Sequence, residues 1–222
     1  MHTFKSLNEK IISCTRCPRL VYFREHAPER KAFRDQAYWR KPVPGFGDPN
    51  GWLLILGMAP AAQGANRTGR IFTGDESARF LMHALYLTGF ANQPSSRAID
   101  DHLKLKGCFL TAAVKCVPPA NHPSKEEFAN CSSYFENELF LLKNLQTVLA
   151  LGKLAFDAYQ RFLKKENIAT SIVPFRHGER VSIKGWPTLY GSYHPSPQNT
   201  YTKKLTEKMF VKLLDSIKQN HQ

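Results

Sequence analysis

The feature that most constrains the fold is a series of short apolar runs, each followed by a segment with helical spacing of apolar residues. Leucine-rich or β-branched runs of strand length predict strands buried on both faces, at 52–56, 108–114, 147–151 and 188–190. Apolar residues spaced three or four apart predict helices at 77–87, 124–144, 153–164 and 205–217. This alternation predicts an α/β fold with a central four-stranded parallel sheet sandwiched between helices.

The alternating pattern begins only at about residue 51, and the segment before it is rich in Arg, His, Pro and aromatic residues. We therefore expect a single domain over 1–222, with an irregular or short-helical arm at about 1–50. No apolar run reaches the ~18 residues of a membrane span, and the start lacks the layout of a secretory signal. We expect no membrane contact and a cytoplasmic protein, associated with the nucleoid if prokaryotic.

The charge is strongly unbalanced, with 31 basic and 18 acidic residues and a formal net charge of +13. Such an excess attracts polyanions, so nucleic acid is the first partner to consider. Charge alone is equally compatible with a basic protein that binds acidic small molecules.

Four of the five cysteines form two pairs. Cys14 and Cys17 make a C-x-x-C motif, 14 residues separate Cys116 from Cys131, and Cys108 is expected in the core. In a chain without a secretory signal, this spacing favours metal ligation over disulfides. Four thiolates can hold zinc or an iron–sulfur cluster, and the uneven gaps match neither a zinc ribbon nor a finger.

Three unusual loops each follow a predicted strand, at 57–75, 115–123 and 191–202. Because the carboxyl ends of parallel strands share one edge of the sheet, we expect the loops to form one site. The first loop is rich in small residues, which let a ligand approach the backbone. It lacks G-x-G-x-x-G and G-K-[ST], which excludes the common nucleotide-binding folds.

Two side chains in these loops are candidates for chemistry. Asp75 precedes a predicted helix, where a carboxylate commonly caps the amino terminus. His194 follows a predicted strand and precedes Pro195, which restricts the backbone. Ser196 and Asn199 add short donors suited to a phosphate.

Several motifs together resemble one family. The stretches Gly57-Met-Ala-Pro-Ala, Gly64-Ala-Asn-Arg-Thr-Gly, Phe72-Thr-Gly-Asp75 and His194-Pro-Ser196 look like the signature loops of type B (family 5) uracil-DNA glycosylases. The cysteine pattern is similar to that of the iron–sulfur glycosylases. The resemblance runs from about Cys14 to Lys212.

The resemblance implies a DNA repair enzyme that hydrolyses the N-glycosidic bond of uracil, and of hypoxanthine or other deaminated bases, leaving an abasic site. The expected partner is DNA, either double-stranded with a deaminated base or single-stranded, and the expected state is a monomer. Cys14, Cys17, Cys116 and Cys131 would hold a [4Fe–4S] cluster that pins the arm to the sheet, with zinc as the alternative.

The resemblance and the residues near these motifs together predict roles within the site. His194 would donate a hydrogen bond to the base, and Asp75 would orient water or stabilise the sugar cation, with Asn66 as a second candidate. The first motif has Met58 and Ala59 where better-known uracil glycosylases carry Asp, Asn or Glu. The expected base-binding residues are Phe72, Asn121, Gly57 and Ala59, and the expected DNA-binding residues are Ser196, Gln198, Asn199 and Lys203.

Two other functions remain open from the residues alone. A metal-containing nucleic-acid-binding protein without enzymatic activity would explain the charge and the cysteines, but not the His-Pro-Ser loop. A hydrolase of small nucleosides or phosphates would explain the loops, but +13 is an unusual charge for it.

Overall fold

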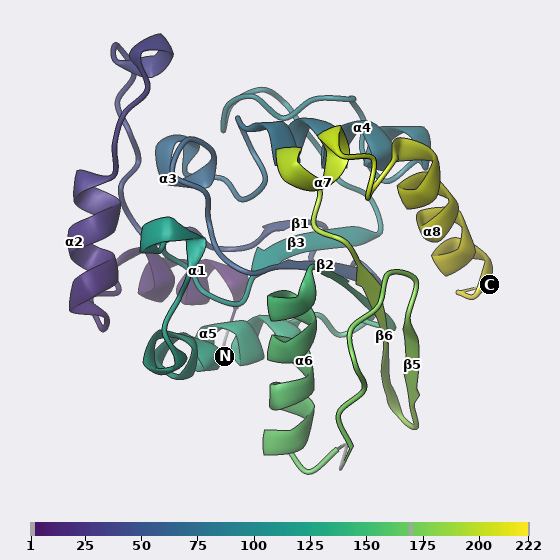
Figure 1. Cartoon of the computed structure of the whole chain (residues 1–222). Coiled ribbons are helices and arrows are strands. Elements are labelled where there is room, and N and C mark those ends of the chain that lie inside the picture. Colours follow the sequence, from purple (N-terminus) through teal and green to yellow (C-terminus); the bar gives the residue numbers. More distant parts are fainter. Residues whose placement is uncertain (1–2, 169–170, 222) are drawn as a thin grey trace.

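The computed structural model describes residues 3–168 and 171–221. Within these ranges one sheet of six strands, in the order β1-β3-β2-β4-β6-β5, is covered by helices on both faces (Figure 1). Its four central strands are mutually parallel, as predicted. In spatial order they are β3 (Cys108–Ala112), β2 (Leu53–Gly57), β4 (Thr147–Leu151) and β6 (Trp186–Ser192).

The prediction of a four-stranded sheet is incomplete, because an antiparallel strand is added at each edge. β1 (Phe46–Gly47) pairs with β3, and β5 (Arg180–Ile183) forms a hairpin with β6. β1 has only two residues and β5 is half exposed, so neither gives the apolar run of a buried strand. Because the two edge strands are short, the sheet presents little unpaired strand backbone to solvent.

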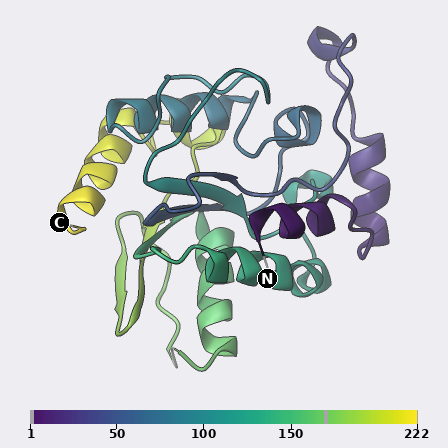
Figure 2. The ribbon, with the colours of Figure 1, turned by 180° about the vertical axis from the view of Figure 1, so that it is seen from behind.

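The sandwich of helices follows from the alternation of side chains along each strand. Leu53 and Ile55 of β2 face a core with α4 (Glu76–Leu87) and α8 (Glu207–Gln219). Leu54 and Leu56 face the opposite core, with α5 (Lys125–Leu141) and α6 (Lys153–Lys165). Figure 2 shows both layers from behind, with the sheet between them.

The arm forms short helices, as predicted: α1 (Phe4–Ile12), α2 (Pro18–His26) and the 3-10 turn η1 (Lys31–Phe33). α1 packs against α5, and its Leu7 and Ile11 are buried. The Phe4 ring lies 5.0 Å from that of Phe109 in β3. Apolar packing therefore joins the start of the arm to the domain. The first two residues of the predicted arm lie outside the described ranges.

The strand order places a topological switch between β2 and β4. From β2 the chain passes through α4 to β3 on one side, and from β4 it passes through α6 to β6 on the other. Crevices of this kind are the usual ligand sites of open α/β sheets. Three short helical segments follow the carboxyl ends: α3 (Ala65–Thr68), the 3-10 turn η2 (Pro119–Asn121) and α7 (Pro197–Tyr201).

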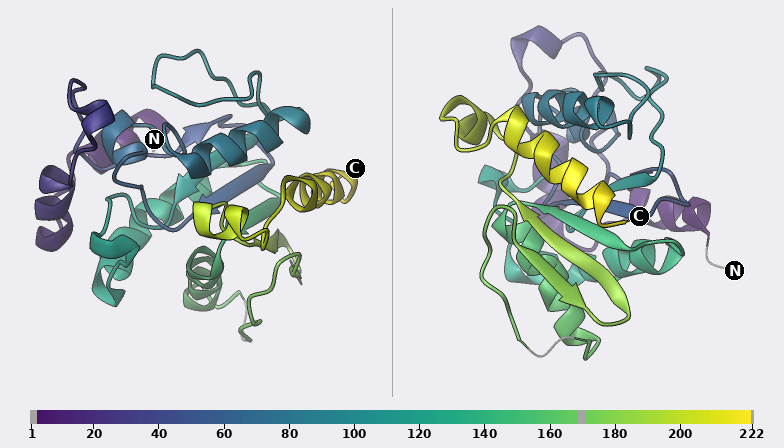
Figure 3. Two further views of the ribbon diagram at one scale, coloured as in Figure 1. Left: turned by 45° about the horizontal axis from the view of Figure 1, so that its top comes forward. Right: turned by 90° about the vertical axis from the view of Figure 1, so that its right-hand side faces the viewer.

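In Figure 3, α7 lies beside the first turns of α4. No helix in the part of the chain that the structure describes is long and apolar enough to cross a membrane.

Candidate active site and cysteine pocket

Of the three loops predicted to converge, those after β2 and β3 meet at the carboxyl edge of the sheet, and the loop after β6 lies beside the end of β4. The carbonyls of Gly57 and Met58 accept hydrogen bonds from Ala113 and Val114, at 3.0 and 2.9 Å, which joins the β2 and β3 loops. Gly152, directly after β4, approaches His194 so closely that an added Cβ would lie 3.3 Å from the histidine Cβ. Gly152 has a φ of 91°, in the left-handed region that favours glycine, and sequence inspection did not single it out.

Asp75 caps α4, as its position before the helix predicted. Its Oδ1 accepts the N–H of Ala78 at 2.8 Å. Its Oδ2 faces Gly64, where an added Cβ would lie 1.9 Å from that oxygen, so only glycine fits there. Burial raises the pKa of Asp75, and the N–H groups of Ala78 and Ser77 offset part of this rise. The cap engages Oδ1 and leaves Oδ2 on the side of the β2 loop.

Arg67 holds the loop around Asp75; it lies in the Gly64–Gly69 motif but was not among the predicted site residues. It is 7% exposed, and its Nη2 donates to the carbonyl of Gly74 at 2.8 Å. Its Nε donates to the carbonyl of Gln63 at 2.9 Å, and its guanidinium lies 3.9 Å from the centre of the Phe33 ring. Arg67 therefore contacts both the arm and the loop that carries Asp75.

His194 lies just beyond the end of β6, partly buried beside Gly152. Burial lowers its pKa to about 4, so the ring is neutral at pH 7 and carries one N–H. Its carbonyl accepts a hydrogen bond from Asn199 Nδ2 at 2.8 Å. A neutral imidazole in a fixed loop is suited to donate one directed hydrogen bond.

Phe72 occupies a strained position at the end of β2. It has a φ of 49°, which is unusual for an aromatic residue, and it is 8% exposed within the core that contains α4. An added Cβ on Gly57 would lie 2.8 Å from Phe72 Cζ, so the ring covers the end of the strand. Strain of this kind clusters at functional sites.

Two other predicted site residues have different surroundings from those expected. Ala59 packs against the small apolar group formed by Leu20, Val114 and Cys131, on the cysteine side of the loop. Asn66 is 1% exposed, and its Nδ2 donates to the carbonyl of Arg24 in α2 at 3.0 Å. Its amide therefore links α3 to the arm.

The remaining predicted residues lie near the surface. Asn121 is exposed in η2 with a φ of 55°, and within the described ranges no hydrogen bond holds its side chain. Ser196 precedes α7, and Gln198 and Lys203 are exposed on that segment. Asn199 is predicted to bind DNA, but its side-chain amide donates to the carbonyl of His194 within the same loop.

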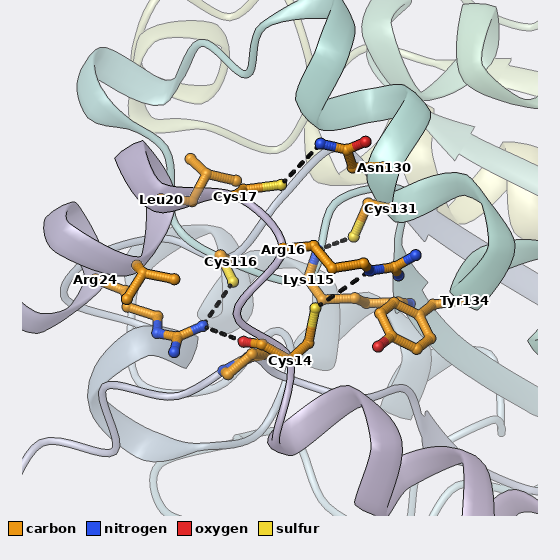
Figure 4. A pocket seen from close by; sticks show the side chains of 12 residues that line it. Cys14, Arg16, Cys17, Leu20, Arg24, Lys115, Cys116, Asn130, Cys131 and Tyr134 are labelled. Atoms are coloured by element: carbon orange, nitrogen blue, oxygen red, sulfur yellow. Dashed lines mark hydrogen bonds between the residues drawn. The ribbon is translucent and has the colours of Figure 1, made fainter.

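The four predicted cysteines line one pocket, together with Arg16, Arg24 and Tyr134 (Figure 4). Each sulfur accepts a hydrogen bond. The pairs are Arg16 Nε to Cys14 at 3.5 Å, Asn130 Nδ2 to Cys17 at 3.7 Å, Arg24 Nη1 to Cys116 at 3.4 Å and the Lys115 backbone N–H to Cys131 at 3.2 Å. Cys108 is fully buried in the core, as predicted.

Arg24 is a buried cation that makes only a long ion pair, to a half-exposed carboxylate. It is 5% exposed, its nearest carboxylate is Glu25 at 3.8 Å, and its Nε has no partner among the described residues. Its Nη1 donates to the Cys14 carbonyl at 3.0 Å as well as to Cys116. A buried cation requires a compensating anion, and cysteine thiolates would supply it.

A second buried charge network lies behind the pocket. Lys115 Nζ is 2.6 Å from Glu138 Oε2, with side chains 1% and 0% exposed, and Thr111 donates to the same oxygen. Glu138 Oε1 accepts the N–H of Gly45 at 3.0 Å. The pair fastens the end of β3 to α5 and to the arm. Sequence patterns miss it because they assign buried positions to apolar residues.

The sequence model of the Uracil DNA glycosylase superfamily matches residues 44–218, a span that contains the whole sheet and the loops at its carboxyl edge. The α/β sheet and this site therefore place the protein in that superfamily of base-excising enzymes.

Individual relatives refine the assignment. The chain is 45% identical to a type-5 uracil-DNA glycosylase of Thermus thermophilus, over 95% of each chain. It is 42% identical to one of Pyrobaculum aerophilum, over 92% of this chain and 88% of the relative, and 41% identical to one of Mycobacterium leprae, over 96% and 93%. Matches of this extent include most of the arm, which the superfamily match leaves out. The chain belongs to the type-5 uracil-DNA glycosylases.

Proposed function

We propose that the protein removes uracil from DNA by hydrolysing the N-glycosidic bond of a flipped-out nucleotide, leaving an abasic site. The observation that carries this proposal is the placement of the Asp75 and His194 loops at the carboxyl edge of the sheet of a type-5 family member, where α7, which follows His194, lies beside the first turns of α4, which Asp75 caps (Figure 3). The basic charge of the chain suits a DNA substrate. Flipping costs a few kcal/mol, and least at a mispair, which favours uracil opposite guanine.

His194 and Asp75 have different roles in the proposed reaction. The bond between the sugar C1′ and the base nitrogen breaks, its electron pair leaves with the base, and the neutral His194 donates a hydrogen bond to the base oxygen that gains charge. Asp75 Oδ2, free of the cap, orients a water molecule towards C1′ and stabilises the cationic sugar. Water supplies the hydroxyl at C1′, and its proton neutralises the departing base.

The base pocket is proposed to contain Phe72 as the stacking ring, Gly57 at the end of β2, and Asn121 at the base edge. Ala59 is proposed to contribute only its backbone, because its methyl group packs on the cysteine side of the loop. The strained backbone of Phe72 and its place over Gly57 support this role. Asn121 is exposed and without a hydrogen-bonded side-chain partner in the described ranges, so its amide is available to a base. A pocket with few fixed polar groups also accepts hypoxanthine.

The α7 segment is proposed to contact the phosphates through Ser196, Gln198 and Lys203. Asn199 contributes by holding the His194 carbonyl at 2.8 Å. We propose double-stranded DNA with a deaminated base as the substrate, with single-stranded DNA also accepted, and a monomeric enzyme acting in the cytoplasm.

A labelled duplex with one U·G mispair tests this function. Incubation followed by alkali is expected to cut the strand at the uracil, while an undamaged duplex stays intact, and hypoxanthine opposite thymine is also expected to be excised. No abasic site at enzyme excess would contradict the glycosylase function and favour a DNA-binding protein without catalysis.

The cysteine pocket is proposed to hold a [4Fe–4S] cluster on Cys14, Cys17, Cys116 and Cys131. Zinc would draw its four ligands to within ~2.3 Å of one ion, whereas a cluster lies between its thiolates and keeps them further apart. The uneven spacing of the four cysteines along the chain, which matches neither a zinc ribbon nor a finger, favours the cluster. Arg24 and the hydrogen bonds to all four sulfurs suit an anionic cluster. Its role is to fasten the arm to the sheet.

Iron analysis tests the cofactor. Protein purified without oxygen is expected to be brown, with about four irons per chain. Cys116→Ala is expected to lose most of this iron, whereas Cys108→Ala, at the buried core cysteine, is expected to keep it. A colourless protein with one zinc per chain would overturn the cluster.

A further inference from the structure

His177 lies in the connection between α6 and β5, in a segment that runs along the end of β6. The N–H of Gly178 donates to the Gly191 carbonyl at 2.8 Å, and the N–H of Gly191 donates to the Glu179 carbonyl at 2.9 Å. These bonds fix the segment on the strand that leads to His194. His177 is partly buried there.

His177 holds the residue before His194. Its Nδ1 accepts the backbone N–H of Tyr193 at 3.2 Å, and its ring stacks on the Tyr193 ring at 5.1 Å with an angle of 14° between the planes. A ring nitrogen accepts a hydrogen bond only when it is unprotonated, so the ring is neutral with its hydrogen on Nε2. Burial lowers the pKa of His177, which favours this neutral form.

The position of Tyr193 explains why its backbone N–H needs the side chain of His177 as an acceptor. The carbonyl of Ser192 accepts the N–H of Gly152 on the β4 side, so the N–H of Tyr193, one residue further on, points to the β5 side. There the pairing of β5 with β6 reaches only as far as Arg180 opposite Tyr190. His177 supplies the acceptor that the neighbouring strand no longer provides. On the other side of His194, Asn199 binds the His194 carbonyl. Two side chains thus hold the backbone before and after the proposed catalytic imidazole.

We propose that His177 is a positioning residue that places His194 against the base. The inference rests on the proposed role of His194. A histidine that donates to a charge formed only in the transition state must be held closely, and a displacement of about 1 Å can cost up to about a hundredfold in rate. His177 acts on the chemical step and leaves the binding of DNA largely unchanged.

Single-turnover excision of uracil from a U·G duplex tests the role. His177→Ala is expected to lower the rate constant about tenfold or more, with the dissociation constant for the duplex changed less than about threefold. His177→Asn is expected to recover most of the rate, because its side-chain oxygen can replace Nδ1 as the acceptor. Equal rates for His177→Ala and the unaltered protein would overturn the inference, as would equal losses in the alanine and asparagine variants.

A double-mutant cycle separates this inference from the proposed function. If His177 acts through His194, adding His177→Ala to a His194→Ala protein is expected to cost less than about twofold. If His177→Ala lowers the rate of the His194→Ala protein as much as it lowers that of the unaltered protein, then His177 does not act through His194. A His194→Ala protein with full activity would instead contradict the proposed function itself. Matching melting temperatures of the variants confirm that each is folded.

Discussion

Replacing His194 with alanine is expected to slow single-turnover excision of uracil about a hundredfold to a thousandfold, the usual effect of removing one donor to a developing negative charge. Burial holds the pKa of His194 at about 4, so the lost group is a neutral donor at pH 7. Because this hydrogen bond strengthens as the base leaves, the loss is expected in the rate and much less in the affinity for DNA.

Two variants sharpen this prediction. His194→Gln retains a side-chain N–H and is expected to keep more activity than the alanine variant. His83→Ala serves as the matched control, because His83 lies half-exposed on α4 and pairs with Glu207 at 2.6 Å. A His194→Ala rate within threefold of the control would remove this residue from the mechanism.

Asp75 is expected to give the second largest effect, a loss of about a hundredfold or more on substitution. Its two oxygens allow the structural and chemical roles to be separated. Serine caps helices about as well as aspartate, so Asp75→Ser keeps the hydrogen bond to Ala78 but removes the carboxylate. Asp75→Ala removes both and is expected to cost about 1 kcal/mol of stability as well.

The comparison of these variants decides the role of Asp75. We expect Asp75→Ser to melt close to the unaltered protein and to be nearly as inactive as Asp75→Ala. An active serine variant beside an alanine variant that is merely less stable would show that Asp75 only caps α4. Thermal unfolding and single-turnover rates provide the two measurements.

The pH dependence of excision follows from the same carboxyl. Burial raises the pKa of Asp75 above its ordinary value, and only the ionised form can orient water and stabilise a cation. The rate is therefore expected to be full above this pKa and to fall as the pH drops through it, at a higher pH than for an ordinary aspartate. Asp75→Ser is expected to abolish this acidic limb.

The sequence predicts the centre of the fold and the edge at which the loops meet, because both depend on local patterns. Leu53 to Leu56 are buried on both faces, and a continuous apolar run is the pattern of such a strand. The cap at Asp75 and the capping box at Ser124 were equally predictable, since each needs only a helix and one preceding side chain.

The contacts that support the site were not predictable, because they join residues far apart in the chain. His177 reaches Tyr193 only through the path of the β5–β6 hairpin, and Arg24 reaches Cys116 only once the arm has folded back. Lys115 and Glu138 would each be assigned to the surface by composition, yet each is buried because the other is present. The side chain of Asn66 is of a type that can act in catalysis. Its amide, however, donates a hydrogen bond to the backbone carbonyl of Arg24, so it has a structural role.

The separation of the cysteine pairs sets an order of events during synthesis. Cys14 and Cys17 emerge from the ribosome well before Cys116 and Cys131, so the pocket is incomplete until α5 has been made. α5 is also the surface on which α1 packs, with Leu7 and Ile11 buried. The helix that completes the pocket is therefore also the one against which the amino-terminal segment packs, so the proposed ligation requires α5 to have been made.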